Sequence, residues 1–400
     1  MIRARSAGLS VACAAILTSP AYGQVDVPPD GLTVAPTVRM VYDDNVLRQN
    51  DDIMTGDTDD LRITPGVDVT FRKVLGVHQV TAVGSLGYDF YQRYDNLNRE
   101  RITLQARGDV KISGLCYLRP RARLNFAQAN LADQGEIVGN SERTQDYSVT
   151  AECDKPYGYY PVINLGYLTT NNSASSRREF DIRTRTAGIG FAYTKASFGD
   201  IRLMFNYDAF RRPHYDGLDS EGRRMSSGAD NYRVGLEFKR AVAPRLSWNA
   251  GLSYIKTKAR DDDVEDYSGL GYHIGAVYQP SPRANVVLDV TRSTSNQSNT
   301  GATYVVQTDF SLRGNYKLGS RSSIQAGATY GRRQFKGELL IDTDTPRGTD
   351  KTTALFAGYR FALRSRLNAG FEFRHEWRES DVDRYRYKST SSMLFIGLQL

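Results

Sequence analysis

Apolar and polar residues alternate at every second position along most of the chain. In the segment 101–112, for example, Ile102, Leu104 and Ala106 alternate with polar side chains. Successive side chains of a strand point to opposite faces, so this period of two predicts strands with one apolar and one polar face. The pattern recurs in the segments 32–43, 231–239, 245–254 and 394–400, and no helical period of 3.6 extends over a useful length.

Short turns and longer polar loops alternate between these segments. The longer loops are expected at Asn45–Asp59, Arg93–Asn98, Ala129–Glu142, Thr170–Arg178, Arg211–Gly228, Lys258–Glu265, Ser295–Gly301, Gln334–Thr349 and Glu379–Arg384. Counting the segments between connections predicts about 18 strands, with 16–18 as the expected range. An even count, with short turns on one side and long loops on the other, is typical of bacterial outer-membrane barrels with both termini in the periplasm.

A membrane barrel also explains a composition that is polar on average. After the N-terminal segment no apolar run approaches the length of a transmembrane helix. In a membrane barrel only alternate residues face lipid, and the strands must close on themselves because hydrocarbon cannot satisfy backbone polar groups. The 25 Tyr and 35 Gly suit interfacial girdles and tight turns. The sequence therefore predicts an all-β fold, a transmembrane antiparallel up-and-down β-barrel, as a single domain spanning residues 24–400.

Residues 1–23 have the features of a cleavable signal peptide. Arg3 and Arg5 precede the apolar segment Ala7–Leu17, and Ala21-Tyr22-Gly23 places small residues at the cleavage positions, so cleavage is expected before Gln24. A lipoprotein signal ending at Cys13 is the alternative, but Cys13 lies inside the apolar segment and lacks a good leading Leu. Export to the bacterial outer membrane is the predicted localisation.

The polar face of the predicted strands carries many charges. Tyr117, Arg119, Arg121, Arg123 and Asn125 would form one ladder with three consecutive lumen-facing arginines. Further pore-lining candidates are Arg107, Lys111, Arg202, Arg233 and Arg374. One interpretation is an internal lattice of salt bridges that stiffens the wall. The other, compatible with the first, is a mildly basic lumen that favours anionic solutes.

A barrel of this size leaves an aqueous bore unless loops fold inward. The two longest loops, Arg211–Gly228 and Gln334–Thr349, are the predicted constricting or gating elements. The net charge of +7 does not indicate nucleic acid as a partner, because charges of both signs are interleaved along the whole chain.

Two cysteines remain after removal of the predicted signal peptide. Cys116 begins the strand before the Ala129–Glu142 loop and Cys153 ends the strand after it, so both are expected at the same rim of neighbouring strands. In an oxidising compartment this placement favours a cross-strand disulfide. The alternative is two independent small apolar side chains.

Catalytic and metal-binding signals are weak. The four histidines are scattered, and no grouping of His, Cys and carboxylates has metal-ligand spacing. Acidic runs at Asp57–Asp60 and Asp261–Asp263 are more typical of solvated loops than of cation sites. No catalytic residue, cofactor or metal is predicted.

The first quarter of the chain resembles a known family. Val34-Ala35-Pro36-Thr37-Val38 leads into Tyr42-Asp43-Asp44-Asn45-Val46, and a second segment reads Asp60-Leu61-Arg62-Ile63-Thr64-Pro65-Gly66-Val67. Together with the Tyr-rich stretch Val83–Tyr94, these motifs resemble the family of putative β-barrel porin 2. The resemblance implies an outer-membrane barrel often encoded with exopolysaccharide synthesis and export systems, and it carries over no catalytic residues. One departure from many barrels is the non-aromatic end, Leu398-Gln399-Leu400.

Three classes of function are compatible with these features. The favoured one is a channel or export porin for acidic exopolysaccharide or small anions. The others are a non-conducting structural or adhesive barrel and a barrel enzyme acting on envelope lipid or sugar. The expected partners are outer-membrane lipid, an anionic polysaccharide and periplasmic export components, while the solute and the oligomeric state stay open.

Overall fold

The computed structural model describes residues 30–50, 52–53, 56–134, 138–215, 227–243, 245–298, 300–337, 347–363 and 366–399. The predicted signal peptide, residues 1–23 with cleavage before Gln24, lies outside these residues.

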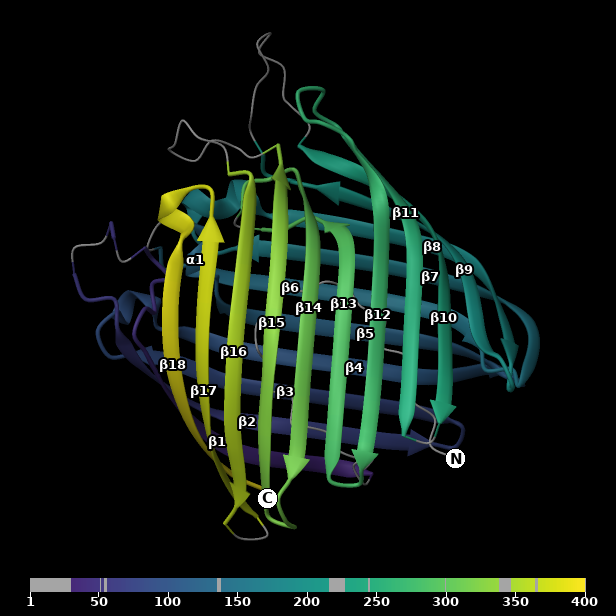
Figure 1. Ribbon diagram of the computed structural model, residues 1–400, viewed down its shortest axis with the longest axis horizontal. Helices are drawn as coiled ribbons and strands as arrows, with labels where there is room; N and C mark the ends of the chain where they lie inside the picture. The colour runs from purple at the N-terminus through teal and green to yellow at the C-terminus, as the bar shows by residue number, and fades with distance from the viewer. Residues whose placement is uncertain are drawn as a thin grey trace.

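Eighteen antiparallel strands of the described chain form one closed sheet (Figure 1). The strands are β1 (Gly31–Asp43), β2 (Asp60–Leu75), β3 (His78–Tyr91), β4 (Arg99–Ser113), β5 (Cys116–Gln128), β6 (Ser141–Cys153), β7 (Tyr157–Asn172), β8 (Ile182–Lys195), β9 (Gly199–Arg211), β10 (Gly228–Ala243), β11 (Leu246–Ala259), β12 (Tyr267–Ser281), β13 (Ala284–Ser295), β14 (Tyr304–Lys317), β15 (Ser322–Lys336), β16 (Thr349–Ala362), β17 (Leu367–Ser380) and β18 (Tyr387–Leu398).

Each strand pairs with the next strand along the chain, and the first strand pairs with the last. The closing pair runs from Thr37 opposite Gly397 to Asp43 opposite Ser391. The predicted fold class and the count of about 18 strands are therefore confirmed. The strands, from 12 residues in β13 to 16 in β2, exceed the roughly 10 residues needed to cross a bilayer, so many extend beyond it.

Short turns and long connections lie at opposite ends of the barrel. The turn between β2 and β3 spans only residues 76–77, whereas the connection between β5 and β6 spans residues 129–140. The long connections hold the short helices η1 (Asp95–Leu97), α1 (Leu131–Gln134), η2 (Ser175–Phe180) and η3 (Asp383–Tyr385). β1 begins and β18 ends at the short-turn end, which we predict to be the periplasmic end.

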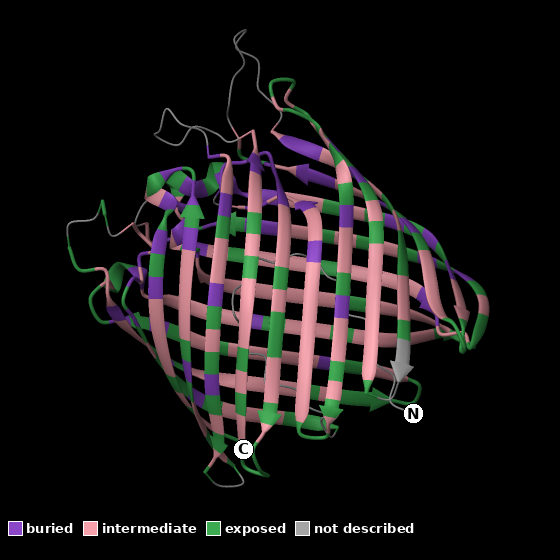
Figure 2. Ribbon diagram, viewed as in Figure 1, coloured by how far each residue is buried: buried purple, intermediate pink, exposed green. Residues whose placement is uncertain are grey.

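The outer face of the barrel is apolar. Along β1 the side chains of Leu32, Val38 and Met40 are exposed, whereas Thr37 and Asp43 on the other face are buried. The exposed and less exposed positions alternate along the strands, as the banding in Figure 2 shows. So many large exposed apolar side chains are unfavourable in water and suit a lipid environment. Among the described residues, no helix combines the length and apolar character needed to cross a membrane.

Aromatic side chains form a girdle on the outer face near each end. The girdle at the long-loop end includes Tyr147, Tyr167, Tyr232 and Tyr254, and the one at the short-turn end includes Tyr157, Tyr159, Tyr193 and Trp248. On β7, Tyr159 and Tyr167 are eight positions apart. At about 3.3 Å per residue and a tilt of about 40°, that places the girdles about 20 Å apart, close to the height of the apolar band of outer-membrane barrels.

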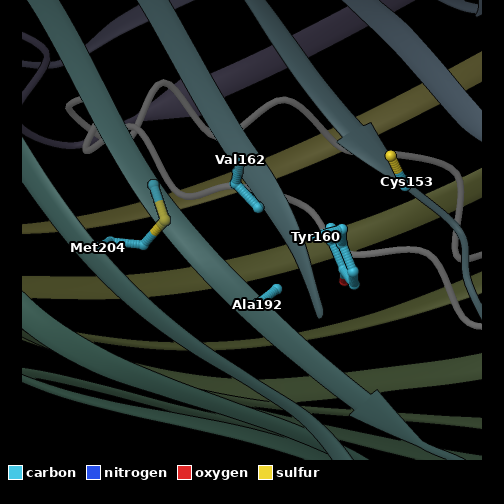
Figure 3. Packing of buried hydrophobic residues seen from close by; sticks show 5 residues of the cluster. All are labelled: Cys153, Tyr160, Val162, Ala192 and Met204. Carbon is cyan, nitrogen blue, oxygen red and sulfur yellow. The ribbon is translucent and has the colours of Figure 1, made fainter. Parts of the chain in front are cut away.

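Cys116 and Cys153 lie directly opposite each other on β5 and β6 and are joined by a disulfide. Cys153 is buried beside Tyr160, Val162, Ala192 and Met204, which come from the next three strands (Figure 3). The Tyr160 hydroxyl donates a hydrogen bond of 3.0 Å to Asp200. The disulfide therefore adds a covalent link to a packed cluster at the short-turn end of the wall.

We predict that the exported protein carries no free thiol. With the signal peptide removed, the folded protein should give no reaction with a thiol reagent before reduction and two thiols per chain after reduction and unfolding. Thiol titration in denaturant, with and without prior reduction, measures this. Two reactive thiols in the unreduced protein would show that Cys116 and Cys153 are not bonded.

Candidate functional site

The inner face of the barrel is the candidate site, because it is polar and encloses the lumen. Arg119, Arg121 and Arg123 alternate along β5 with apolar residues of the outer face, so all three occupy inward positions. The other pore-lining candidates also occupy inward positions: Arg107 and Lys111 on β4, Arg202 on β9, Arg233 on β10 and Arg374 on β17.

Arg119 belongs to a lattice of ion pairs near the short-turn end. Its guanidinium lies 3.0 Å from Asp109 and 2.7 Å from Asp154, and it also contacts Glu152. Glu152 is shared with Arg202, at 2.8 Å, and Arg202 continues the lattice to Asp200, at 3.0 Å. These pairs connect β4, β5, β6 and β9, so they stiffen the wall.

A second lattice lies on the wall formed by β1 to β4. Arg39 donates to both oxygens of Asp68, at 2.9 and 2.7 Å, and to Ser85. The buried carboxylate of Asp89 lies 2.6 Å from Arg101 and 3.9 Å from Arg62. Each guanidinium here faces a carboxylate, which is the arrangement that the salt-bridge interpretation predicts.

Arg107, Arg121 and Arg123 form a different arrangement, which we call the basic patch. Arg107 and Arg121 lie directly opposite each other on β4 and β5, and Arg123 lies two positions further along β5. Asp146 of β6 lies directly opposite Arg123 and interacts electrostatically with Arg123 and Arg121. Arg107 has no ion pair among the described residues and is exposed to the lumen. Like charges directly opposite each other repel and destabilise the wall, and an anion bound between them would reduce this repulsion.

The remaining candidates divide between the two arrangements. Arg374 pairs with Glu376, whose carboxylate also accepts a hydrogen bond from Tyr387. Lys111 and Arg233 form no ion pair within the described part of the chain. The lattice and the basic lumen therefore coexist at different places on the wall.

The connection between β5 and β6, residues 129–140, folds into the mouth of the barrel, and we call it the inward loop. Its described residues are 129–134 and 138–140. Leu131 packs against Leu47 and Leu97, which come from the connections after β1 and β3. Ala132, Asp133 and Gln134 of α1 are buried. The inward loop thus crosses the long-loop end, from its own strands toward the far wall.

A cluster of charges on the far wall holds the inward loop. Asp133 lies 2.7 Å from Arg333, 3.1 Å from Arg347 and 2.9 Å from Arg378. Arg333 and Arg378 occupy inward positions on β15 and β17. Asp350 of β16 pairs with the same three arginines, and the Arg378 guanidinium donates a hydrogen bond of 2.7 Å to the Ala132 carbonyl.

Most of this cluster is buried. Asp133 and Arg378 are each only 3% exposed, and the Arg347 guanidinium stacks over the Tyr385 ring at 3.9 Å. Burial alone would raise the pKa of Asp133, but the guanidiniums of Arg333 and Arg347 outweigh it and hold that pKa below its usual value. Removing one partner from a buried charge cluster leaves unbalanced charges, which typically costs about 3–5 kcal/mol.

The sequence pointed to other loops as constricting elements. The predicted gating loops Arg211–Gly228 and Gln334–Thr349 are only partly described, because residues 216–226 and 338–346 lie outside the described residues. Their gating role therefore stays a prediction. The second of these loops does supply Arg347, which pairs with Asp133. The inward loop was missed because length was the criterion. Its signal was the set of apolar residues in this connection, such as Leu131, Ala132 and Val138.

Within the described residues, no group of three or more His, Cys, Asp or Glu side chains is placed to hold a metal ion. His214 lies 2.9 Å from Asp181 in the connections of the long-loop end, and His375 contacts Thr390 on the outer face.

The sequence profile of the family described as putative beta-barrel porin 2 matches residues 197–400, half of the chain. The chain belongs to this family. The family inferred from the sequence is thus confirmed, although the match lies in the second half and the motifs that suggested it lie in the first quarter. The chain is a porin-like β-barrel of the bacterial outer membrane.

Solved structures of other barrels resemble the chain over most of its length. The BenF-like porin from Pseudomonas fluorescens Pf-5 has 10% identity and a TM-score of 0.48, with 92% of this chain and 99% of that chain covered. OccK2 (OpdF) from Pseudomonas aeruginosa, in complex with glucuronate, has 10% identity and a TM-score of 0.46, with 92% and 98% covered. No curated protein matches the chain.

We predict that Asp133→Asn releases the inward loop. The substitution leaves two buried arginines, Arg347 and Arg378, and the half-buried Arg333 facing Asp350 alone, which should weaken docking by about 3 kcal/mol. Single-channel recordings in planar bilayers should show a larger and noisier conductance than the wild type. Glu379→Gln is the control, because it removes a carboxylate from an exposed pair with Lys351 and should change nothing. Equal conductance of D133N and wild type would show that the inward loop does not limit flow.

The docked loop should also respond to acid. A carboxyl group whose pKa is depressed in the folded state stabilises that state above its unfolded pKa, and this stabilisation is lost as the pH falls through the folded pKa. Conductance should therefore be constant from pH 7 down to about pH 4 and should rise only below that. In D133N the acid-induced step should be absent. If D133N showed an acid-induced rise in conductance of the same size, titratable groups other than Asp133 would be responsible for it.

Proposed function

We propose that this protein is a channel that conducts anionic solutes through its lumen. The observation that carries the proposal is the basic patch, because Arg107 and Arg121 face each other across neighbouring strands and Arg107 is exposed to the lumen. A cationic wall within a narrow, low-dielectric channel raises the local concentration of anions. Arg119, by contrast, is neutralised by the carboxylates around it, so we assign to it a structural role and not a role in attracting anions.

The chemistry of the patch indicates the class of solute. Guanidinium groups recognise carboxylates and phosphates through paired, charge-assisted hydrogen bonds. Three guanidiniums on two neighbouring strands suit a solute with repeated negative charges better than a single small ion. An acidic exopolysaccharide, which carries negative charges along its length, is such a solute. The family resemblance to barrels encoded with exopolysaccharide systems favours the same solute.

The inward loop sets the condition under which the channel conducts. It is docked on the wall opposite its own strands by a buried cluster, so it narrows the mouth at the long-loop end. A docked loop that sealed the mouth completely would favour the alternative, a non-conducting structural barrel. Conductance of the wild-type protein distinguishes the two functions.

We predict that the purified, folded protein gives discrete conductance steps in planar bilayers and prefers anions over cations. In the triple variant R107Q/R121Q/R123Q, the reversal potential in a salt gradient should shift toward cation preference, because three lumen-facing cations are removed while the fold keeps its neutralised lattices. An acidic polysaccharide added to one side should reduce the wild-type current and should have a much weaker effect on the triple variant.

The matched control is K73Q/K195Q/R240Q, which removes three cations from outward positions at the short-turn end. Its reversal potential and its block by polysaccharide should equal those of the wild type. Absence of conductance steps in folded wild-type protein would end the channel proposal. Conductance without any change in selectivity in R107Q/R121Q/R123Q would end the assignment of the basic patch.

A further inference from the structure

Basic side chains gather on the outer face of the barrel as well, beside the aromatic girdle of the long-loop end and just beyond it. Arg183 and Arg185 of β8, Arg211 of β9, and Lys256 and Lys258 of β11 share the outward face with the apolar residues of their strands. We call these five residues the outer basic patch. Because they face away from the lumen, they play no part in the proposed conduction.

The strand register shows that the five side chains lie close together. Arg183 lies directly opposite Arg211, and Lys256 lies directly opposite Tyr232 of the girdle. Arg185 lies directly opposite Tyr167, another girdle residue. Lys258 on β11 lies opposite Asp230 on β10, Asp230 lies opposite Ala209 on β9, and Ala209 lies opposite Arg185 on β8. Only two strands therefore separate Lys258 from Arg185.

Among the described residues, only one of the five charges of this patch, that of Arg211, is paired with a carboxylate, in contrast to the lattices of the inner face. Asp230, the acidic residue of that row, is already engaged by Arg211 at 2.6 Å, by Arg260 at 3.0 Å and by the Tyr207 hydroxyl at 2.7 Å. Arg185, Lys256 and Lys258 are exposed, and within the described chain none of the three has an ion pair.

Lipid-facing cations are tolerated only near an interface. A Lys or Arg on the lipid face costs about 2–4 kcal/mol at the bilayer midplane and about 0–1 kcal/mol near the headgroups. Long basic side chains beside a girdle extend their charged ends to the headgroup level while their stems cover apolar surface. The outer basic patch therefore lies where the phosphates of a membrane leaflet would lie.

The location also identifies the leaflet. Long loops of outer-membrane barrels face the outside, and short turns face the periplasm. Of the outward cations Lys73, Lys195 and Arg240 at the short-turn end, Lys195 and Arg240 lie on β8 and β10, and Lys73 lies far from both on β2, so no group of five comparable to the outer basic patch is formed by them. The concentrated positive charge is thus on the side of the outer leaflet, whose lipid in Gram-negative bacteria is a glycolipid with phosphate groups on its sugars.

We propose that the outer basic patch is a binding site for the phosphorylated sugar headgroup of the outer-leaflet glycolipid, the lipid A class. The guanidiniums and ammonium groups would bind the phosphates, and Tyr167, Tyr232 and Tyr254 would pack against the sugars and the upper acyl chains. This site goes beyond the proposed channel function and does not depend on it.

Native mass spectrometry of the folded, full-length exported chain in detergent tests the site, with diphosphorylated lipid A as the probe. The wild type should retain lipid A, and R185Q/K256Q/K258Q should bind it at least about tenfold more weakly, since each cation near an anionic surface contributes about 1 kcal/mol. Lipid A from which both phosphates have been removed should bind weakly to both proteins.

Three controls separate charge from folding and from other partners. K73Q/K195Q/R240Q, with three cations removed from the other rim, should bind lipid A as the wild type does. R185K/K256R/K258R keeps the charges and should also keep binding, so a loss of binding there would contradict the proposal. Conductance of R185Q/K256Q/K258Q should equal that of the wild type, which shows that the barrel is folded and separates this site from the lumen.

Other outcomes would overturn the proposal. Equal retention of lipid A by the wild type and R185Q/K256Q/K258Q would remove the patch as the site. Equal retention of lipid A with and without its phosphates would remove the phosphate as the recognised group. Light scattering that shows dissociation of an oligomer in R185Q/K256Q/K258Q, in the absence of lipid A, would instead make the patch an interface between copies of this chain.

Discussion

The pairing of β1 with β18 is the interaction on which the rest of this structure depends. Inside hydrocarbon no water can bond the free N–H and C=O groups of an edge strand, so an open sheet of this size would carry two unsatisfied edges. The register from Thr37–Gly397 to Asp43–Ser391 removes both edges at once. Closure then divides every strand into a face toward lipid and a face toward an enclosed lumen. The separation of apolar outside from charged inside follows from that division.

Arginines of the inner face have three different roles, and the neighbouring side chains determine the role of each arginine. Arg119 is surrounded by three carboxylates and stabilises the wall. Arg107 faces another arginine and water, which leaves its charge available to a solute. Arg378 is buried with Asp133 and Asp350 and fixes a loop in place. A lumen described only by its net charge would miss these differences.

The sequence predicted the barrel well because its signal is local. Alternation along each strand and the spacing of turns reveal the strand count, and neighbouring strands pair in chain order, so little long-range information is needed. The inward position of Arg119, Arg121 and Arg123 follows from the same alternation. Their different partners do not, since Glu152 and Asp154 reach Arg119 only through the register of β5 with β6. The contact between Asp133 and Arg378 could not be predicted from the sequence, because the two residues are 245 positions apart and no local pattern connects them.

That same separation determines when the mouth of the barrel takes its final shape. The strands on either side of the inward loop are the fifth and sixth of eighteen, whereas the residues that hold it belong to β15, β17 and the connection before β16. Long-range contacts form late because the intervening chain must first be ordered. The loop therefore cannot dock before β15, β16 and β17 are in place, because the partners of Asp133 belong to β15 and β17 and to the connection before β16. The position of the inward loop is thus a property of the complete barrel, because a chain without its final strands would lack the arginines that hold Asp133.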